Sequence, residues 1–216
     1  MSYQRVLERL EAAAMRAGRS PDEITLVVVT KNQPVEAIQA VYEQGARHFG
    51  ENRVQELLAK KPLLPPDIQW HLIGHLQTNK VKTVLPHIVL LHSLDRESLL
   101  QEIKKRASTP LPCLIEVKIA QEPSKHGIPP EAVWDFVEKV LAEPVIQLRG
   151  LMGMATFTSD KAQIRQEFRS LYRLFEELRQ FHPDADTLSM GMSQDFEIAI
   201  EEGATMVRVG TAVFDP

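Results

Sequence analysis

The sequence predicts a single α/β domain, a (β/α)8 (TIM) barrel with an extra helix at its N-terminus. Eight strand-like segments occur along the 216 residues, the first of them rich in β-branched residues, and helix-like segments alternate with them regularly. Such alternation indicates a parallel sheet, either closed as a barrel or open and doubly wound, and eight repeats favour the barrel. No linker rich in Ser, Gly or Pro divides the chain, so we expect residues 1–216 to form one domain.

The chain opens with an amphipathic helix. Apolar residues recur at helical spacing between Tyr3 and Ala14, and Gly18 is a suitable end for that helix. The first strand follows at residues 24–30, a nearly unbroken apolar run of the kind that parallel sheets bury on both faces. Pro34 stands where the next helix begins.

The remaining elements repeat this pattern. The other expected strands are residues 46–50, 69–74, 88–92, 111–119, 146–152, 187–190 and 205–209. The expected helices between them are residues 53–59, 79–85, 97–107, 131–142, 162–181 and 194–201. The chain ends at Pro216, just after the eighth strand, so we expect the N-terminal helix to take the place of an eighth barrel helix.

Composition and charge exclude several classes of function. The net charge of −4 gives no broad basic field, so we do not expect nucleic-acid binding. No apolar run is long enough to cross a bilayer, and the N-terminus lacks the apolar stretch of a signal peptide. The single cysteine, Cys113, lies in an apolar run and is expected in the core. One cysteine forms no intrachain disulfide, and we therefore expect a cytoplasmic protein.

The segments after the last two strands have the composition of a phosphate site. In a barrel the active face lies at the carboxyl ends of the strands, and phosphate sites often use the loops after strands seven and eight. Gly191 allows close backbone approach, and Ser193 is expected to cap the helix that follows. After the eighth strand, Gly210 allows a tight turn and Thr211 supplies a hydroxyl group. A plain helix cap beside a tight turn is the competing interpretation, and the position of the group at the end of the barrel favours phosphate.

Lys31 ends the first strand directly after Thr30. Most lysines at strand ends only extend their charge into water. A lysine among apolar walls and near a second cation, which Arg208 would supply, loses affinity for its proton and becomes a nucleophilic amine. A ligand with a carbonyl and a phosphate would then be held as an imine at Lys31 and by the phosphate site at Ser193 and Gly210.

Other polar residues carry weaker signals. The seven histidines form no helix-spaced metal motif, so we expect no metal site. His75 follows the third strand and is expected to line the mouth, whereas His48 lies within a strand and is expected to be structural. Glu51 either orients neighbouring groups or is solvated.

Several long motifs, in the same order, resemble those of the pyridoxal 5′-phosphate (PLP) homeostasis proteins, a PLP-binding family of barrels. They lie at residues 28–31, 49–56, 70–80, 122–127, 188–195 and 207–214, and cover nearly the whole chain. The ending Phe214-Asp215-Pro216 departs from the family, whose members commonly have Gly after Phe. The barrel is also similar to the N-terminal domain of bacterial alanine racemase, the PLP fold type III.

This resemblance implies PLP as the cofactor and assigns residues to it. Lys31 would carry PLP as an internal aldimine, and Asn52 would face the cofactor from the second strand. The phosphate would be held by Ser193, Gly210 and Thr211, with the amides near Gly191 and Met192. Arg208 would lie near the pyridine nitrogen.

We expect a non-catalytic PLP carrier or regulator rather than an enzyme. An arginine at the pyridine nitrogen weakens the ring as an electron sink, and Tyr3, Tyr42 and Tyr172 all fall in expected helices, away from the mouth. A weak PLP-dependent amino-acid racemase is the first alternative. A Schiff-base aldolase-like barrel for a sugar phosphate, without PLP, is the second. We expect a monomer whose partners are PLP and either a regulatory protein or PLP-dependent apoenzymes, none of which leaves a motif in the sequence.

Overall fold

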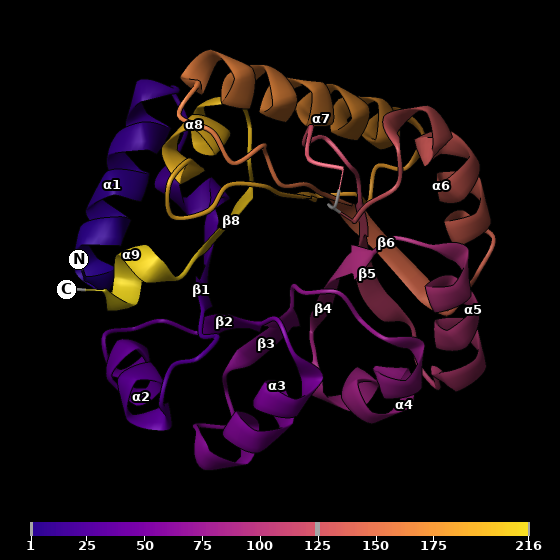
Figure 1. The fold of residues 1–216 in the computed structure, drawn as a ribbon, viewed down its shortest axis with the longest axis horizontal. Coiled ribbons are helices and arrows are strands. Elements are labelled where there is room, and N and C mark those ends of the chain that lie inside the picture. The colour runs from indigo at the N-terminus through magenta and orange to yellow at the C-terminus, as the bar shows by residue number, and fades with distance from the viewer. Residues whose placement is uncertain (1, 124–125, 216) are drawn as a thin grey trace.

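Eight parallel strands close into a barrel in the order in which they occur along the chain, β1 to β8 (Figure 1). The computed structural model describes residues 2–123 and 126–215. The strands are β1 (Thr25–Val29), β2 (His48–Glu51), β3 (Gln69–Leu72), β4 (Leu90–Leu94), β5 (Leu111–Glu116), β6 (Ile146–Met152), β7 (Thr187–Ser189) and β8 (Met206–Val209). Pairing of β1 with β8 closes the ring. The predicted (β/α)8 barrel is therefore confirmed, and the alternative of an open, doubly wound sheet is wrong.

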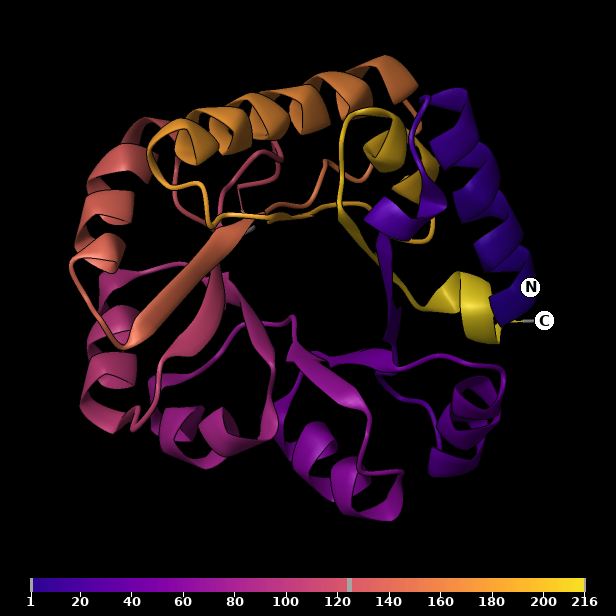
Figure 2. The same ribbon diagram turned by 180° about the vertical axis from the view of Figure 1, so that it is seen from behind.

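Helices surround the barrel on the outside (Figures 1 and 2). They are α1 (Tyr3–Arg16), α2 (Val35–Glu43), α3 (Val54–Lys60), α4 (Val81–Val84), α5 (Glu97–Arg106), α6 (Val133–Leu141), α7 (Lys161–Phe181), α8 (Phe196–Glu201) and α9 (Thr211–Phe214). Short 3-10 turns flank α4, so the helix expected at 79–85 is only one regular turn. Pro86 lies in the second of these turns, where its ring and missing N–H oppose a longer helix.

Helix α1 fills the gap beside β8. Only the single turn α9 follows β8 among the described residues, and α1 packs against both α8 and α9. Arg9 of α1 forms an ion pair with Glu197 of α8, and Arg16 reaches Glu201 at 3.2 Å. The two ends of the described chain therefore lie side by side (Figure 1), as the sequence predicted for the N-terminal helix.

The alternation of side chains along the strands decides which residues enter the barrel. Val27 and Met206 belong to a small buried cluster that lines the interior, whereas Val28 and Val207 join the larger core between the barrel and its helices. Successive side chains of a strand point to opposite faces. Val29 of β1 and Arg208 of β8, each two residues after an interior side chain, are therefore expected to face the interior as well.

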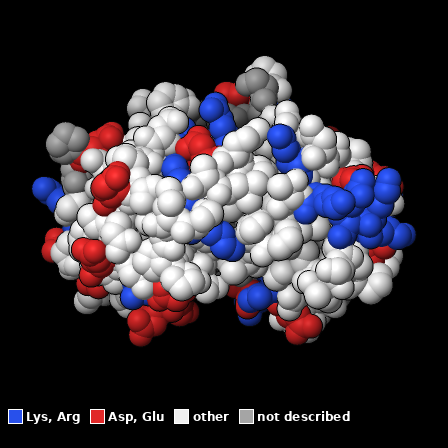
Figure 3. Space-filling model, turned by 90° about the horizontal axis from the view of Figure 1, so that it is seen from below, with Lys and Arg blue, Asp and Glu red and all other residues white. Residues whose placement is uncertain are grey.

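The exterior is mixed in charge. The face in Figure 3 carries both signs, with basic side chains gathered near one end and acidic ones near the other. Cys113 is buried in the core, as expected. No helix within the described ranges is long and apolar enough to span a membrane.

Candidate functional site at the carboxyl end of the barrel

The eight residues assigned from the sequence all lie at or just beyond the carboxyl ends of β1, β2, β7 and β8. Because these strands are parallel and β8 pairs with β1, their ends meet on one side of the barrel mouth. Residues far apart in the chain are thus brought to one end of the fold. Three of them, Gly191, Met192 and Ser193, form the turn after β7.

Lys31 stands in the turn that follows β1. It lies two residues beyond the end of β1, at the barrel mouth, and is exposed. The next residue, Asn32, has a left-handed φ of 60°, and its amide donates to Glu56 Oε2 at 3.0 Å. Lys31 has no hydrogen bond or ion pair with any other described residue, so its amine is available to a ligand.

A buried ion pair holds the strand ends behind Lys31. Glu51 of β2 is completely buried, and its Oε1 accepts from Lys60 Nζ at 2.6 Å and from Thr30 Oγ1 at 2.7 Å. Lys60 also donates to the backbone oxygen of Thr30 at 2.7 Å. Burial raises the pKa of Glu51 above its ordinary value, while the bonds from Lys60 and Thr30 oppose that rise. The suggestion that Glu51 is solvated was wrong; it ties β1 to β2.

We expect Lys60→Met to destabilise the protein by about 3–5 kcal/mol, because it leaves the Glu51 carboxylate buried without its ion partner. Urea unfolding of the variant beside Lys82→Met, which removes an exposed lysine of α4, measures the difference. Equal stability of the two variants would show that the buried pair does not hold this strand end.

Ser193 does not cap helix α8, contrary to the expectation from sequence. Helix α8 begins only at Phe196, and the residue at its N-cap position is Asp195. Asp195 Oδ1 instead accepts from the Met192 amide at 2.7 Å, which tightens the turn before the helix. The Ser193 hydroxyl is thereby directed to the start of α9, where it accepts from the amides of Gly210 and Ala212, each at 3.3 Å.

The glycine at position 191 meets two requirements at once. Its φ is +101°, in the left-handed region that favours glycine. A Cβ there would lie 2.6 Å from the Cβ of Ala199 and 2.9 Å from the Cα of Phe196. The close backbone approach inferred from the sequence is therefore present, and its purpose is to seat α8 against the β7 turn.

Arg208 of β8 lies in the barrel interior, close to the turn that contains Gly191 and Ser193. It is 3% exposed, donates to Ser189 Oγ, and reaches the backbone oxygen of Gly153 at 3.3 Å. Burial lowers the pKa of its guanidinium to about 10, and the charges of Glu116 and Asp195 oppose this. The side chain remains a fixed cation at neutral pH.

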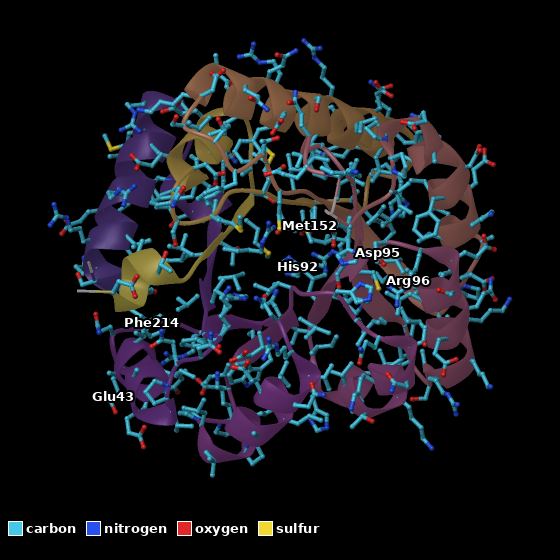
Figure 4. All side chains as sticks on the ribbon, viewed as in Figure 1. Glu43, His92, Asp95, Arg96, Met152 and Phe214 are labelled. Carbon is cyan, nitrogen blue, oxygen red and sulfur yellow. The ribbon has the colours of Figure 1, made fainter. Side chains whose placement is uncertain are left out.

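A chain of histidines continues from Arg208 across the interior. His92 Nδ1 lies 2.9 Å from Ser189 Oγ, and its Nε2 lies 2.9 Å from His71 Nδ1. His71 Nε2 in turn lies 3.0 Å from Nδ1 of His48. Figure 4 shows His92 near the middle of the barrel. Both ring nitrogens of His71 and of His92 therefore have a hydrogen-bond partner, which satisfies groups that are costly to bury alone.

Burial keeps these rings neutral. It lowers the pKa of His71 from 6.5 to about 3 and that of His92 well below 6.5, with neighbouring charges as smaller causes. A histidine whose pKa falls on folding gives stability that is present above the unfolded value and is lost as pH falls toward the folded value. For His71 that window runs from about pH 6.5 to about 3.

We therefore expect stability to fall below pH 6.5, and each of the two rings to add about 1.4 kcal/mol per pH unit to the slope. Thermal unfolding of His71→Leu/His92→Leu and of the unaltered protein between pH 7 and pH 4 compares the slopes. The double variant is expected to have the shallower one. Parallel slopes would contradict the assignment of neutral buried rings.

On the opposite side of the mouth, His75, Asp95 and His126 come together from the loops after β3, β4 and β5. One ligand atom from each lies within 4.8 Å of the others. Asp95 is already paired with Arg96 at 2.7 Å, and the two imidazoles stack at 4.4 Å (Figure 4 labels Asp95 and Arg96). We interpret His75, Asp95 and His126 as residues that line the barrel mouth, which is the position expected for His75. The absence of a metal site stays a prediction. Residues 124 and 125 of the motif at 122–127 lie outside the described residues.

The fold is a closed (β/α)8 barrel with its candidate site at the carboxyl ends of the strands, and comparison with known proteins assigns the family. The model of the alanine racemase N-terminal domain matches residues 2–215. A pyridoxal phosphate homeostasis protein of Aquifex aeolicus is 45% identical over 215 residues, covering 97% of this chain and 94% of its own length. The one from Escherichia coli K12 is 39% identical over 216 residues, with 97% and 92% covered.

Solved structures agree with this assignment. PipY of Synechococcus elongatus PCC7942, solved with PLP bound, superposes with a TM-score of 0.83 at 35% identity, covering 97% of this chain and 99% of its own. Alanine racemase of Corynebacterium glutamicum is similar in fold alone, with a TM-score of 0.75 at 12% identity. It covers 96% of this chain and 59% of its own. The chain belongs to the pyridoxal phosphate homeostasis protein family, within the alanine racemase N-terminal domain family.

Proposed function

We propose that this protein binds PLP as a Schiff base on Lys31 and acts in PLP homeostasis as a carrier or regulator. The observation that carries the proposal is the placement of Lys31 in the turn after β1, with no partner among the described residues, while the hydroxyl and amide cluster at Ser193 and Gly210 belongs to the turns after β7 and the neighbouring strand β8. PLP would supply an aldehyde that forms an imine with an amine and a ring that withdraws electrons. Relatives named for PLP homeostasis and the PLP-bound PipY support the choice of cofactor.

The residues present fit such a cofactor. The amides of Gly210 and Ala212 already converge on one oxygen, the Ser193 hydroxyl, which stands where an oxyanion acceptor belongs. A Cβ at Gly210 would lie 3.1 Å from Val29, so a larger residue crowds this corner. We propose that Ser193, Gly210 and Thr211 hold the phosphate, together with the amides near Gly191 and Met192, and that Asn52 faces the cofactor.

Arg208 is the residue that favours a carrier over an enzyme. A carboxylate at the pyridine nitrogen would keep that nitrogen protonated, and a fixed guanidinium does not. The three tyrosines also lie away from the mouth: Tyr3 in α1, Tyr42 in α2 with its hydroxyl 2.6 Å from Asp67, and Tyr172 in α7. Hence no tyrosine supplies a second proton-transfer group at Lys31.

Titration of purified, PLP-free protein with PLP tests the proposal. An imine absorption band that saturates at one PLP per chain, together with no racemisation of L-alanine by the loaded protein, is the expected result. Failure to bind PLP would rule out PLP as the cofactor and favour the Schiff-base barrel that acts on a sugar phosphate. Racemisation that disappears in Lys31→Ala would favour the weak racemase. A monomeric, cytoplasmic carrier in one domain, serving apoenzymes or a regulatory partner, completes the proposal.

A further inference from the structure

A polar pocket lies at the carboxyl ends of β2 and β3, apart from the proposed phosphate-binding residues Ser193 and Gly210. It has a volume of about 260 Å³ and lies between the loop after β2 and the loop after β3. In the closed strand order, β1 stands between β8 and β2, so Lys31 separates this pocket from Ser193 and Gly210. The polar side chains that line it are Asn52, Arg53, Gln55, His75, Gln77 and Lys80.

Every one of these side chains is of a type that can donate a hydrogen bond, and none is a carboxylate. The side chains of two of them, Arg53 and Lys80, form no ion pair or hydrogen bond with the described part of the chain, although the charge of Arg53 interacts with that of Glu56. Many basic side chains elsewhere on the surface are paired, such as Arg165 with Glu201 at 2.6 Å and Lys139 with Glu97 at 2.6 Å. Two unpaired cations facing one pocket with amide donors point to an anionic ligand.

The cofactor's own phosphate does not account for this charge. Its proposed holders, Ser193 and Gly210, lie after β7 and β8, whereas Arg53 and Lys80 follow β2 and β3. Asn52 belongs both to the pocket and to the proposed cofactor site, so the two are contiguous. A ligand in the pocket would lie beside whatever is attached to Lys31.

We propose that this pocket binds a small carboxylate, the α-carboxylate of an amino or keto acid that approaches the amine of Lys31. The volume suits a small metabolite rather than a peptide. Arg53 would bind the carboxylate in a bidentate manner, Lys80 would neutralise it, and the amides of Gln55 and Gln77 would fix its orientation. The identity of the ligand as an amino or keto acid rests on the proposed PLP function; the preference for a carboxylate rests on the pocket alone.

The test uses L-lactate, a carboxylate with neither amine nor ketone, and inorganic phosphate as probes. Each is titrated into isotope-labelled protein, with and without added PLP, while the side-chain amide signals of Gln55 and Gln77 are followed by NMR. Arg53→Gln/Lys80→Gln is compared with Arg5→Gln/Lys82→Gln, which removes the same charges from exposed positions outside the pocket. PLP loading of each variant is measured separately by absorption.

We expect lactate to shift both glutamine signals and to bind about tenfold or more weakly to Arg53→Gln/Lys80→Gln, with the control variant unchanged. Equal lactate affinity in both variants, or binding of phosphate but not lactate, would overturn the inference. A loss of PLP binding in Arg53→Gln/Lys80→Gln alone would also overturn it, because the pocket would then belong to the cofactor. If the unaltered protein binds lactate here but takes up no PLP, the proposed function fails while the carboxylate pocket stands.

Discussion

Lys31→Ala is expected to abolish the borohydride-stable attachment of PLP and to weaken PLP binding by about two orders of magnitude. The reason is chemical, since alanine has no amine with which to form the imine. The phosphate cluster and Arg208 remain, so weak non-covalent binding should persist. Absorption titration and reduction with borohydride measure the two effects.

Lys118→Ala is the matched control for this prediction. Lys118 also follows a strand at the mouth, after β5, and its side chain has no ion pair or hydrogen bond with another described residue. We expect it to bind PLP like the unaltered protein. Equal retention of covalent PLP in both variants would reject Lys31 as the attachment point.

The second large effect is expected at Gly191. Gly191→Ala combines a left-handed backbone with a Cβ that collides with Ala199 and the backbone of Phe196, and we expect a loss of about 3 kcal/mol of stability. Because the collision displaces α8 and the turn that contains Ser193, PLP affinity should fall as well. Thermal unfolding and absorption titration measure the two losses.

Gly45→Ala separates the collision from the backbone strain. Gly45 has a similar φ of +109°, yet a Cβ there meets nothing within 4 Å. It should lose only about 1 kcal/mol and keep its PLP affinity. If the two variants lose equal stability, the close approach of α8 is not what requires glycine at position 191.

The βα rhythm of the sequence was sufficient to predict the barrel, because period and burial are local signals. The positions of Lys31 after β1 and of Arg208 on β8, at the carboxyl end of the barrel, followed once these strands were placed. The start of α8 was predicted two residues too early. Both Ser193 and Asp195 are good N-cap types, and only the contact of Ser193 with Gly210 and Ala212, after the next strand, decides between them.

Features that depend on neighbouring strands were missed. His71 and His92 stand in different strands, and nothing local indicates that their rings meet each other. Lys60 lies just beyond the helix expected at residues 53–59 and was given no role, although it is the buried partner of Glu51. In each case the partner is set by strand register and helix placement. A polar residue at an interior position of a predicted barrel strand was the signal available for His71.

Peptide mapping of borohydride-reduced, PLP-loaded protein tests the central claim most directly. Mass spectrometry should find the reduced pyridoxyl group on the peptide that contains Lys31, at one group per chain. Attachment at another lysine of the mouth, such as Lys80 or Lys118, or no covalent attachment in a protein that has bound PLP, would contradict the account.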